Sequence, residues 1–210
     1  MQIVLPRGRM LDDSLELLRQ AVPNIRIEDN RKLVQENGEH DLLLAKPADV
    51  PVYLEEGAEV GITGRDVVRE TDPDVFIPIS LPFGQCRLSV GRLEEDPTPP
   101  EEMDGYRIAT EYPKVAERYF ESLGTSVEII EVSGSTELAP KAGIADALVD
   151  IVQTGNTLAA NGLEEASIIM ESSALLLVNR IAQKTKFDRI NKIVFSIREV
   201  IEDEAEKIRR

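Results

Sequence analysis

The sequence predicts an α/β protein made of two lobes, and two observations support this prediction. Short apolar strands alternate with amphipathic helices from the first residues onward, which is typical of a mostly parallel sheet with helices on its faces. Around residues 93–105 the composition changes to prolines and acidic residues, which indicates a solvated connector. The alternation then restarts, so we expect a second small lobe to begin near residue 91.

In the first lobe each expected strand is followed by a helix. The strands are residues 2–5, 41–44 and 60–63, and the helices are residues 11–22, 47–56 and 65–70. The first helix has apolar residues at helical spacing on one face and stops before Pro23. The second has Pro47 near its first turn and Gly57 just past its end, positions at which these two residues are favoured.

The second lobe repeats the pattern. We expect strands at residues 107–110, 127–132, 147–152 and 174–179, and a helix over residues 113–123 with Gly124 as its C-cap. From Arg189 the chain has the periodicity of one amphipathic helix with the apolar stripe Ile190, Ile193, Val194, Ile197, Val200 and Ile201. This stripe indicates packing against the first lobe or against another subunit, and not binding of a cofactor.

Composition and charge argue against several classes of protein. The chain has 210 residues, 42% of them hydrophobic, and no apolar run approaches the ~20 residues of a membrane span. The single cysteine, Cys86, excludes an intrachain disulfide, and with only one histidine a structural zinc site is not expected. The net charge of −15 argues against a nucleic-acid surface. With no secretory signal visible after Met1, the chain is expected in the cytoplasm.

The most informative segment ends at Leu158. Residues 147–152 have the length and apolar character of a buried strand, and Thr154, Gly155, Asn156 and Thr157 follow before a run of helix formers. Free N–H groups at a helix start, threonine hydroxyls and a permissive glycine together form a cradle for phosphate. Asp150, near the carboxyl end of the strand, is placed to accept hydrogen bonds from sugar hydroxyls. The segment therefore predicts a ribose-5-phosphate site.

A plainer interpretation stays open for each of these residues. Thr-Gly-Asn-Thr is an ordinary turn in many proteins, because glycine and asparagine favour turns. Asp146 and Asp150 also suit strand ends or an exposed surface. The order of strand, loop and helix favours phosphate binding more than any one residue does.

Several motifs in one order resemble a known family. The first is the spacing of Glu137, Gly143, Ala145, Asp150, Thr154, Gly155, Thr157 and Leu158. Residues 5–9, 46–51, 61–66 and 83–87 also match, so the resemblance covers nearly the whole chain. These residues are similar to those of the ATP phosphoribosyltransferases of histidine biosynthesis, whose phosphoribosyl-pyrophosphate signature has this spacing. Leu148 stands where that family more often has a β-branched residue.

The resemblance implies a type II periplasmic-binding-protein-like fold with a ligand cleft between its two lobes. It places lobe I, on the ATP side, at residues 1–90 and 179–210, and lobe II, on the phosphoribosyl-pyrophosphate side, at residues 91–178. The chain is expected to cross between lobes near residues 86–91 and 174–179. The implied reaction joins N1 of the ATP adenine to C1 of phosphoribosyl pyrophosphate and releases pyrophosphate, the first step of histidine biosynthesis.

The resemblance and the local chemistry suggest two groups of site residues. Phosphoribosyl pyrophosphate is expected at Glu137, Asp146, Asp150, Thr154, Gly155, Asn156 and Thr157. ATP and pyrophosphate are expected at Arg7, Gly8, Arg9, Lys46, Asp49, Gly64, Arg65, Asp66 and Arg87. The family usually has Lys at position 7 and Arg at position 46, so this chain keeps both charges with altered geometry. Arg-Gly-Arg is also common as an exposed loop, and Arg87 has the alternative of pairing with a surface acid.

No side chain is expected to act as a nucleophile, because displacement at an anomeric carbon depends on positioning and charge control. Mg²⁺ is expected to enter with the phosphorylated substrates. The chain resembles the short form of the family, which lacks a C-terminal regulatory domain and in many organisms works with a histidyl-tRNA-synthetase-like subunit. We also expect a homodimer or a larger assembly.

Two alternatives from other classes stay open. A non-catalytic solute-binding or sensor domain would share the fold, although the missing signal argues against an exported binder. An interaction protein with a vestigial phosphate loop is the other, and the retained loop residues argue against it. Release of pyrophosphate from ATP and phosphoribosyl pyrophosphate would distinguish the enzyme from both.

Overall fold

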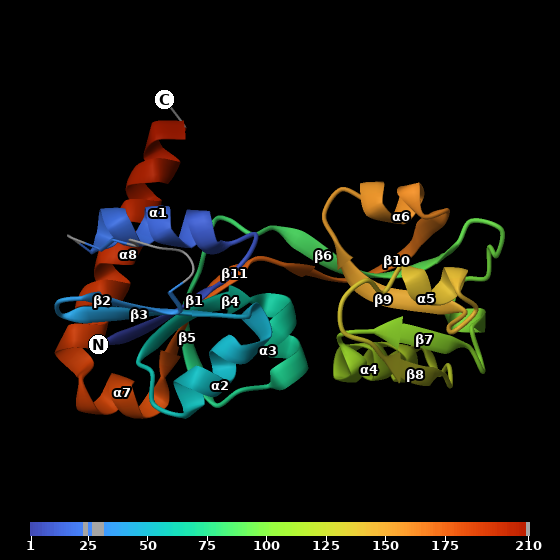
Figure 1. Ribbon diagram of the computed structural model, residues 1–210, viewed down its shortest axis with the longest axis horizontal. Helices are drawn as coiled ribbons and strands as arrows, with labels where there is room; N and C mark the ends of the chain where they lie inside the picture. Colours follow the sequence, from blue (N-terminus) through green and yellow to red (C-terminus); the bar gives the residue numbers. More distant parts are fainter. Residues whose placement is uncertain (23–24, 27–31, 209–210) are drawn as a thin grey trace. The chain divides into compact units, whose positions relative to one another are not determined.

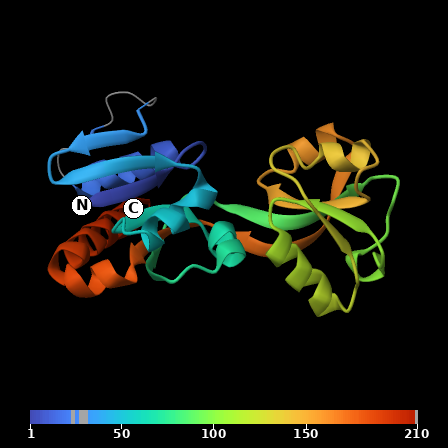
Figure 2. The ribbon, with the colours of Figure 1, turned by 60° about the horizontal axis from the view of Figure 1, so that its bottom comes forward.

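The computed structural model describes residues 1–22, 25–26 and 32–208. The chain divides into two compact units, unit 1 from residues 1–84 and 173–210 and unit 2 from residues 85–172. Each unit has one sheet with helices on its faces (Figures 1 and 2). This arrangement agrees with the predicted α/β class.

Unit 1 is built on a six-stranded sheet in the order β2-β3-β1-β4-β11-β5. Its strands are β1 (Gln2–Pro6), β2 (Val34–Asn37), β3 (His40–Ala45), β4 (Val60–Gly64), β5 (Val75–Ser80) and β11 (Ala174–Asn179). β1 pairs in parallel with β3 and β4, whereas β2 and β11 run antiparallel to their neighbours. All five residues of β4 and four of the five of β1 are buried, because both faces of the sheet are covered.

Helices cover the two faces of this sheet. They are α1 (Leu11–Ala21), α2 (Val50–Glu55), α3 (Arg65–Thr71), α7 (Arg180–Thr185) and α8 (Phe187–Ile208), with a 3-10 turn η1 at Pro47–Asp49. Ile190, Ile193 and Ile197 of α8 share one core with α1 and the strands. Full burial of such a side chain stabilises the fold by roughly 1.5–3 kcal/mol. The apolar stripe of the last helix therefore packs on unit 1, the first of its two predicted alternatives.

Unit 2 contains a five-stranded sheet in the order β10-β6-β9-β7-β8. Its strands are β6 (Cys86–Leu93), β7 (Arg107–Thr110), β8 (Glu128–Glu131), β9 (Ala147–Val152) and β10 (Leu163–Ser172). Its helices are α4 (Pro113–Leu123), α5 (Leu138–Lys141) and α6 (Asn156–Ala160), with a 3-10 turn η2 at Pro100–Glu102. Phe120 of α4 packs with Val149 in one core, while Ala139 of α5 and Leu158 of α6 pack with Leu148 in the other. The two sides of β9 therefore face different helices.

The boundaries between the units lie a few residues from the predicted ones. The chain leaves unit 1 after Gly84 and returns after Ser172, instead of near residues 90 and 178. β6 and β11, which were expected as crossing segments, each belong to one sheet. β6 pairs only within unit 2, with β9 and β10, and β11 pairs within unit 1, with β4 and β5. Hydrogen-bonded partners thus assign each strand to a unit, and sequence composition does not reveal these partners.

Residues 93–105 form the solvated connector that their composition indicated, since their acidic side chains other than Asp96 are exposed, but this connector lies inside unit 2. They join β6 to β7 inside unit 2, and Met103 is fully buried in the core beneath α4. Tyr106 Oη donates to Asp96 Oδ2 at 2.9 Å, and Thr98 Oγ1 donates to Asp96 Oδ1 at 2.6 Å. The segment is therefore a solvated turn that Met103 and the contacts of Asp96 anchor within one unit, and it is not a boundary between two units.

Most expected elements are present, and two of the strands that were not expected, β2 and β5, are the outermost strands of the unit 1 sheet. The helix at Pro113–Leu123 ends, as predicted, at Gly124, which has φ +75°. β2 carries Gln35 and Glu36, and β5 contains Pro78, so neither has the regular apolar alternation of a strand. Both strands depend on a neighbour for their conformation, which a local pattern does not encode.

Candidate substrate site

The three parallel strands β7, β8 and β9 of unit 2 all end on one side of their sheet, which we call the carboxyl edge. β7 lies between β8 and β9, and Thr110 is paired with Glu131 on one side and Val149 on the other. Because the carboxyl ends of parallel strands meet at one edge, the loops after these strands come together there. This edge gathers most of the predicted phosphoribosyl-pyrophosphate residues, namely Glu137, Asp150, Thr154, Gly155, Asn156 and Thr157.

The loop after β9 has a backbone that requires glycine. Gly155 has φ +82° and ψ −5°, where a residue with a side chain is strained, although a Cβ atom would touch nothing. The N–H of Asn156 donates to Thr154 Oγ1 at 3.4 Å, and α6 begins at this residue. Leu158 is buried in the core beneath and anchors the loop to the sheet. Thr154, Asn156 and Thr157 are exposed, so their polar groups are accessible to a ligand.

Asp150 is the most unusual carboxyl group at this edge. Its Oδ2 accepts a hydrogen bond from the Thr136 hydroxyl, and its Oδ1 accepts one from the N–H of Ile151 at 2.6 Å. Burial raises the pKa of Asp150 above its usual value, the carboxylates of Glu137 and Glu111 raise it further, and the two hydrogen bonds oppose this shift. A perturbed carboxyl of this kind is typical of a binding or catalytic site.

Two residues of this edge were missed by the sequence analysis. Thr136 is fully buried and donates to Asp150, and Glu111, just after β7, accepts a hydrogen bond from the N–H of Gly134. A signal was available for Thr136, since Ser133, Gly134, Ser135 and Thr136 follow a strand as Thr154 to Thr157 do. Glu111 carried no local signal, because its neighbours at the edge come from two other loops.

Asp146 is separated from this group. It lies just before the first residue of β9, at the opposite edge of the sheet from the loop at Thr154. Its carboxylate forms an ion pair with Arg107 at 2.9 Å and accepts the backbone N–H of Arg107, also at 2.9 Å. The hydrogen bond from Arg107 is the main cause that lowers the pKa of Asp146. The structure therefore shows Asp146 joining β7 to β9, away from the other residues of this group, and its contact with the substrate stays a prediction.

Unit 1 has a second edge of the same kind, and it gathers cations. β1 and β3 end level with each other, since Pro6 is paired with Ala45, and the N–H of the next residue, Arg7, donates to Ala45 O at 2.7 Å. β4, on the other side of β1, ends at Gly64. The residues directly after these three strands are Arg7, Lys46 and Arg65. Three cations from three separate motifs thus follow adjacent strand ends.

The remaining residues predicted for ATP surround this edge. Gly8 has φ +92° and lets the chain turn before α1, leaving Arg9 exposed. Asp49 is exposed at the end of η1, whereas Gly64 and Asp66 are buried. Arg65 is half-buried, and its Nη2 donates to Ser80 Oγ at 3.1 Å. Arg7, Arg9 and Lys46 are therefore the predicted cations with exposed side chains.

Arg87 lies in unit 2 and is bound to an acid, the alternative that its sequence context left open. Its Nε and Nη2 donate to the two carboxylate oxygens of Glu165 at 2.5 and 2.7 Å. Its Nη1 donates to Gln153 O at 3.1 Å. The hydrogen bond to Glu165 raises the pKa of Arg87, and the same contact lowers the pKa of Glu165. Nε, Nη1 and Nη2 of Arg87 therefore all donate to groups of unit 2.

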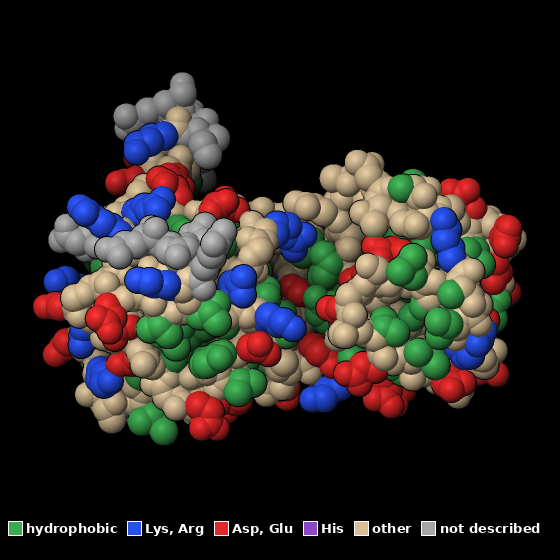
Figure 3. Space-filling view, viewed as in Figure 1, with side chains coloured by type: hydrophobic (Ala, Val, Ile, Leu, Met, Phe, Trp, Pro, Cys, Tyr) green, Lys and Arg blue, Asp and Glu red, His purple; other side chains and the backbone are tan. Residues whose placement is uncertain are grey.

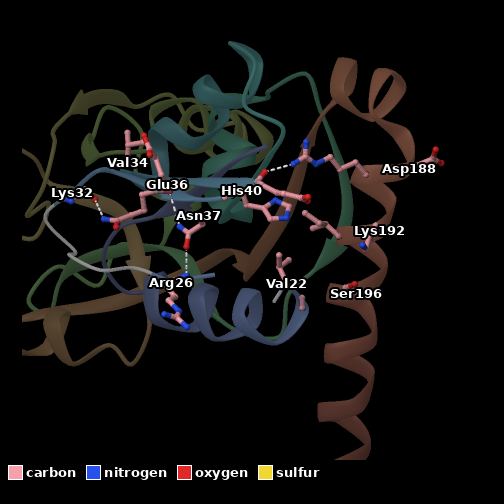
Figure 4. A pocket seen from close by; sticks show the side chains of 16 residues that line it. Val22, Arg26, Lys32, Val34, Glu36, Asn37, His40, Asp188, Lys192 and Ser196 are labelled. Carbon is pink, nitrogen blue, oxygen red and sulfur yellow. Dashed lines mark hydrogen bonds between the residues drawn. The ribbon is translucent and has the colours of Figure 1, made fainter. Parts of the chain in front are cut away.

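Unit 1 also contains a cavity of about 1600 Å³ that none of the predicted substrate residues lines. It lies among the turn between β2 and β3, the end of α1 and the first half of α8 (Figure 4). His40 faces it, with Nδ1 buried and without a hydrogen-bond partner, and burial lowers the pKa of His40. Because His40 begins β3, this cavity is at the opposite edge of the sheet from Lys46.

Charged side chains of both signs lie on the surface of the two units. On the face drawn in Figure 3, acidic side chains are spread over unit 2 and are mixed with Lys and Arg over unit 1. Within residues 1–22, 25–26 and 32–208, no three His, Cys, Asp or Glu side chains are grouped to hold a metal ion. Among the same residues, no helix has the length and apolar character needed to cross a membrane.

Comparison with known proteins identifies the family. The model of the HisG family, ATP phosphoribosyltransferase, matches residues 46–199. This chain belongs to the ATP phosphoribosyltransferase family. An ATP phosphoribosyltransferase from Thermococcus gammatolerans is 58% identical over 205 residues, which cover 98% of this chain and 100% of that protein. One from Pyrococcus furiosus is 54% identical over 94% of this chain and 97% of that protein.

Solved structures support the same conclusion. A chain of the ATP phosphoribosyl transferase (HisG:HisZ) complex from Thermotoga maritima is 31% identical, with a TM-score of 0.86 over 97% of this chain and 99% of that chain. An amino-acid ABC transporter extracellular-binding protein from Bacillus subtilis, ytmK, is only 14% identical, with a TM-score of 0.60 over 97% and 92% of the two chains, and shows the fold alone. The predicted periplasmic-binding-protein-like fold is confirmed. The chain is a phosphoribosyl-transferring enzyme of the first step of histidine biosynthesis.

Proposed function

We propose that the carboxyl edge of unit 2 binds phosphoribosyl pyrophosphate. Thr154, Gly155, Asn156 and Thr157 hold its 5-phosphate through backbone N–H groups and hydroxyls, and Asp150 with Glu137 accepts hydrogen bonds from the ribose hydroxyls. The main support is that separate loops after β8 and β9 bring these carboxylates and this hydroxyl-rich loop to one edge. The raised pKa of Asp150 adds to this support, because a buried carboxylate is stabilised when a ligand donates a hydrogen bond to it.

The cationic edge of unit 1 is proposed to bind the phosphates of ATP and the released pyrophosphate. Arg7, Arg9 and Lys46 are exposed there, and Arg65 follows the neighbouring strand. Guanidinium and ammonium groups neutralise polyphosphate charge and form charge-assisted hydrogen bonds with it. Gly8 and Gly64 allow the backbone to approach the ligand, and Asp49 and Asp66 lie at the starts of the helical segments beside the cations.

These assignments account for the chemistry of transfer. N1 of the adenine displaces pyrophosphate at the anomeric carbon, and the ribose acquires positive charge in the transition state. The carboxylates of Asp150 and Glu137, hydrogen-bonded to the ribose hydroxyls, stabilise this positive charge electrostatically. The cations of unit 1 stabilise the negative charge of the leaving pyrophosphate. Release of pyrophosphate from ATP and phosphoribosyl pyrophosphate tests the activity directly. If both substrates bind and no pyrophosphate is released, these site assignments do not account for the transfer.

A metal ion takes part in this family's reaction, and we propose that it is Mg²⁺ bound to the substrate phosphates. Mg²⁺ prefers oxygen ligands and is commonly held through substrate phosphates together with one or two carboxylates. Asp150, Glu137 and Glu111 give the phosphoribosyl-pyrophosphate edge an acidic character that suits a cationic substrate complex. Activity is therefore expected to be lost with excess chelator and to return with added Mg²⁺.

The partners and location follow from the same family assignment. We propose that the chain works in the cytoplasm, as a homodimer or larger assembly, together with a histidyl-tRNA-synthetase-like regulatory subunit. The Thermotoga maritima relative is a HisG:HisZ complex, which supports a second subunit. Cys86 is the single cysteine and is buried, so the chain has no intrachain disulfide, which agrees with a reducing compartment.

Thr157→Val is expected to impair use of phosphoribosyl pyrophosphate without unfolding the protein. Thr157 is exposed, so replacing its hydroxyl by a methyl group removes a phosphate donor and leaves the core unchanged. Loss of a hydrogen bond to a charged group costs ~1.5–3 kcal/mol, or roughly a tenfold to hundredfold loss in kcat/KM for this substrate. Thr185→Val, an exposed threonine of α7, is the matched control. A wild-type kcat/KM in Thr157→Val would contradict the phosphate assignment.

Histidine is expected to leave the isolated chain active and to inhibit it only when the regulatory subunit is present. Feedback requires a second site whose occupancy is coupled to the substrate sites, and we assign that site to the partner. Rates are measured with and without histidine, before and after the partner is added. Saturable inhibition of the isolated chain would overturn this assignment.

A further inference from the structure

A row of polar side chains crosses the sheet of unit 2 next to the proposed phosphate loop. Ser89 of β6 is paired in register with Asp150 of β9, so both side chains lie on the same face of the sheet. Ser89 is fully buried, and its Oγ donates to Oε1 of Glu165 on β10 at 2.6 Å. The row therefore begins at Asp150 on β9, the proposed ribose ligand, passes through Ser89 on β6 and ends at Glu165 on β10.

Glu165 holds Arg87 in a fixed orientation. The two side chains form a bidentate ion pair, with N–O distances of 2.5 and 2.7 Å, and each is only 24% exposed. A bidentate pair fixes the plane of the guanidinium as well as its position. Ser89 occupies a further site on the same carboxylate, so Glu165 has little freedom to rotate.

The third contact of Arg87 connects this pair to the loop. Its Nη1 donates to the carbonyl oxygen of Gln153 at 3.1 Å. Gln153 is the residue between the end of β9 and Thr154. Arg87 is paired with Val152 in the ladder, so its guanidinium reaches forward along β9 to the point where the strand becomes the loop.

We propose that Glu165 is a positioning residue for phosphoribosyl pyrophosphate, acting through Arg87 on the carbonyl of Gln153 to fix the start of the loop Thr154–Thr157. This inference rests on the proposed assignment of that loop to the 5-phosphate. The role differs from the pyrophosphate contact that the sequence suggested for Arg87, because its donors are used inside unit 2. Ion pairs that keep contact with solvent contribute little to stability, so the main effect of this partly exposed pair is geometric.

A second arginine–glutamate pair on β6 and β10, Arg92 with Glu164, provides a matched control. Arg92 of β6 donates to Glu164 of β10 from Nε at 2.9 Å and from Nη2 at 2.7 Å. Its Nη1 also donates to backbone carbonyls, those of Pro97 at 2.5 Å and Thr98 at 2.7 Å. Both arginines thus use Nε and Nη2 for a glutamate of β10 and Nη1 for backbone carbonyls, although Arg92 binds a single oxygen of Glu164. The second pair contacts the turn after β6 and not the phosphate loop.

The experiment compares Glu165→Gln with Glu164→Gln. For Glu165→Gln we expect KM for phosphoribosyl pyrophosphate to rise roughly five- to twentyfold, with KM for ATP within about twofold of wild type. Glu164→Gln is expected to leave both KM values within about twofold of wild type. Melting temperatures of both variants are measured alongside, and similar small decreases are expected, since each variant loses one charged pair.

Two further variants test the connection through Arg87. Arg87→Lys keeps the charge but replaces the fork with a single ammonium group, so KM for phosphoribosyl pyrophosphate should rise without loss of folding. In an Arg87→Ala background, Glu165→Gln should add less than about a twofold further change, because its partner is already absent. A full, independent effect of Glu165→Gln in that background overturns the proposed route.

The outcomes separate this inference from the assignment of the loop. If Thr157→Val raises KM for phosphoribosyl pyrophosphate but Glu165→Gln does not, the loop assignment stands and the positioning role is wrong. If Glu165→Gln and Glu164→Gln raise that KM equally, the effect is general to the strands and the positioning role is also wrong. If Thr157→Val has no effect, the loop assignment fails and the inference falls with it.

Discussion

Asp150→Asn is expected to reduce kcat/KM for phosphoribosyl pyrophosphate roughly 10- to 100-fold, since a charge-assisted hydrogen bond contributes ~1.5–3 kcal/mol. The ribose loses its charged acceptor, and the amide has one acceptor oxygen where the carboxylate has two. The fold should tolerate the change, because the side chains have nearly the same shape. The Thr136 hydroxyl can rotate to accept from the new amide, and Ile151 N–H keeps an oxygen acceptor. Steady-state rates with varied phosphoribosyl pyrophosphate measure the effect.

The same variant should be more stable than the wild type at neutral pH. Burial raises the pKa of Asp150, so its contribution to stability is fully present below the unfolded-state pKa and is lost as pH rises through the folded-state pKa. Asparagine does not ionise, so the variant does not lose stability as pH rises. The melting temperature of Asp150→Asn relative to wild type is therefore expected to be positive at pH 7 and to shrink toward pH 4.

Asp146→Asn is the matched control, because it changes the same residue type at the opposite end of β9. Its pKa is lowered chiefly by the hydrogen bond from Arg107, so its stabilising effect is present above the unfolded-state pKa and is lost as pH falls. Asp146→Asn should lose stability at pH 7 and keep kcat/KM for phosphoribosyl pyrophosphate near wild type. If the two variants have the same kinetic defect, the separation of Asp146 from the site is wrong.

The double variant Arg7→Ala, Lys46→Ala is expected to lower kcat/KM for ATP by about 100-fold or more, since each cation supplies ~1.5–3 kcal/mol to a bound polyphosphate. The two residues are adjacent at the ends of β1 and β3, so their effects need not be additive. Both side chains are exposed, and their removal should change the melting temperature little. Rates with varied ATP and thermal melts provide the two measurements.

The control for this prediction removes a cation elsewhere in the same unit. Arg198 is exposed on α8, and Arg198→Ala should leave kcat/KM for ATP within about twofold of wild type. This comparison separates a local contact from the general attraction of an anion by positive charge. An Arg7 and Lys46 double variant with wild-type ATP kinetics would move the ATP site away from this edge.

The sequence by itself determined most local elements, including the positions of the main loops. The helix at Pro113–Leu123 with its glycine cap, the strand at Ala147–Val152 and the loop that follows it were all predicted from residue types and spacing. These features depend on neighbours within a few positions, namely backbone propensities, caps and periodicity. The order of several motifs also indicated the family, which no single motif would have done.

Only the tertiary structure decided which of these residues meet. Asp146 and Asp150 are four positions apart, yet they lie toward opposite ends of one strand, one paired with Arg107 and the other near Glu137. Glu111 joins Asp150 and Glu137 at the carboxyl edge of unit 2 because β7 lies between β8 and β9. Arg87 pairs with Glu165, 78 positions away, because β6 and β10 are neighbours. Strand order and register are set by packing of the whole sheet, so the partners of these charges are not encoded in the sequence around them.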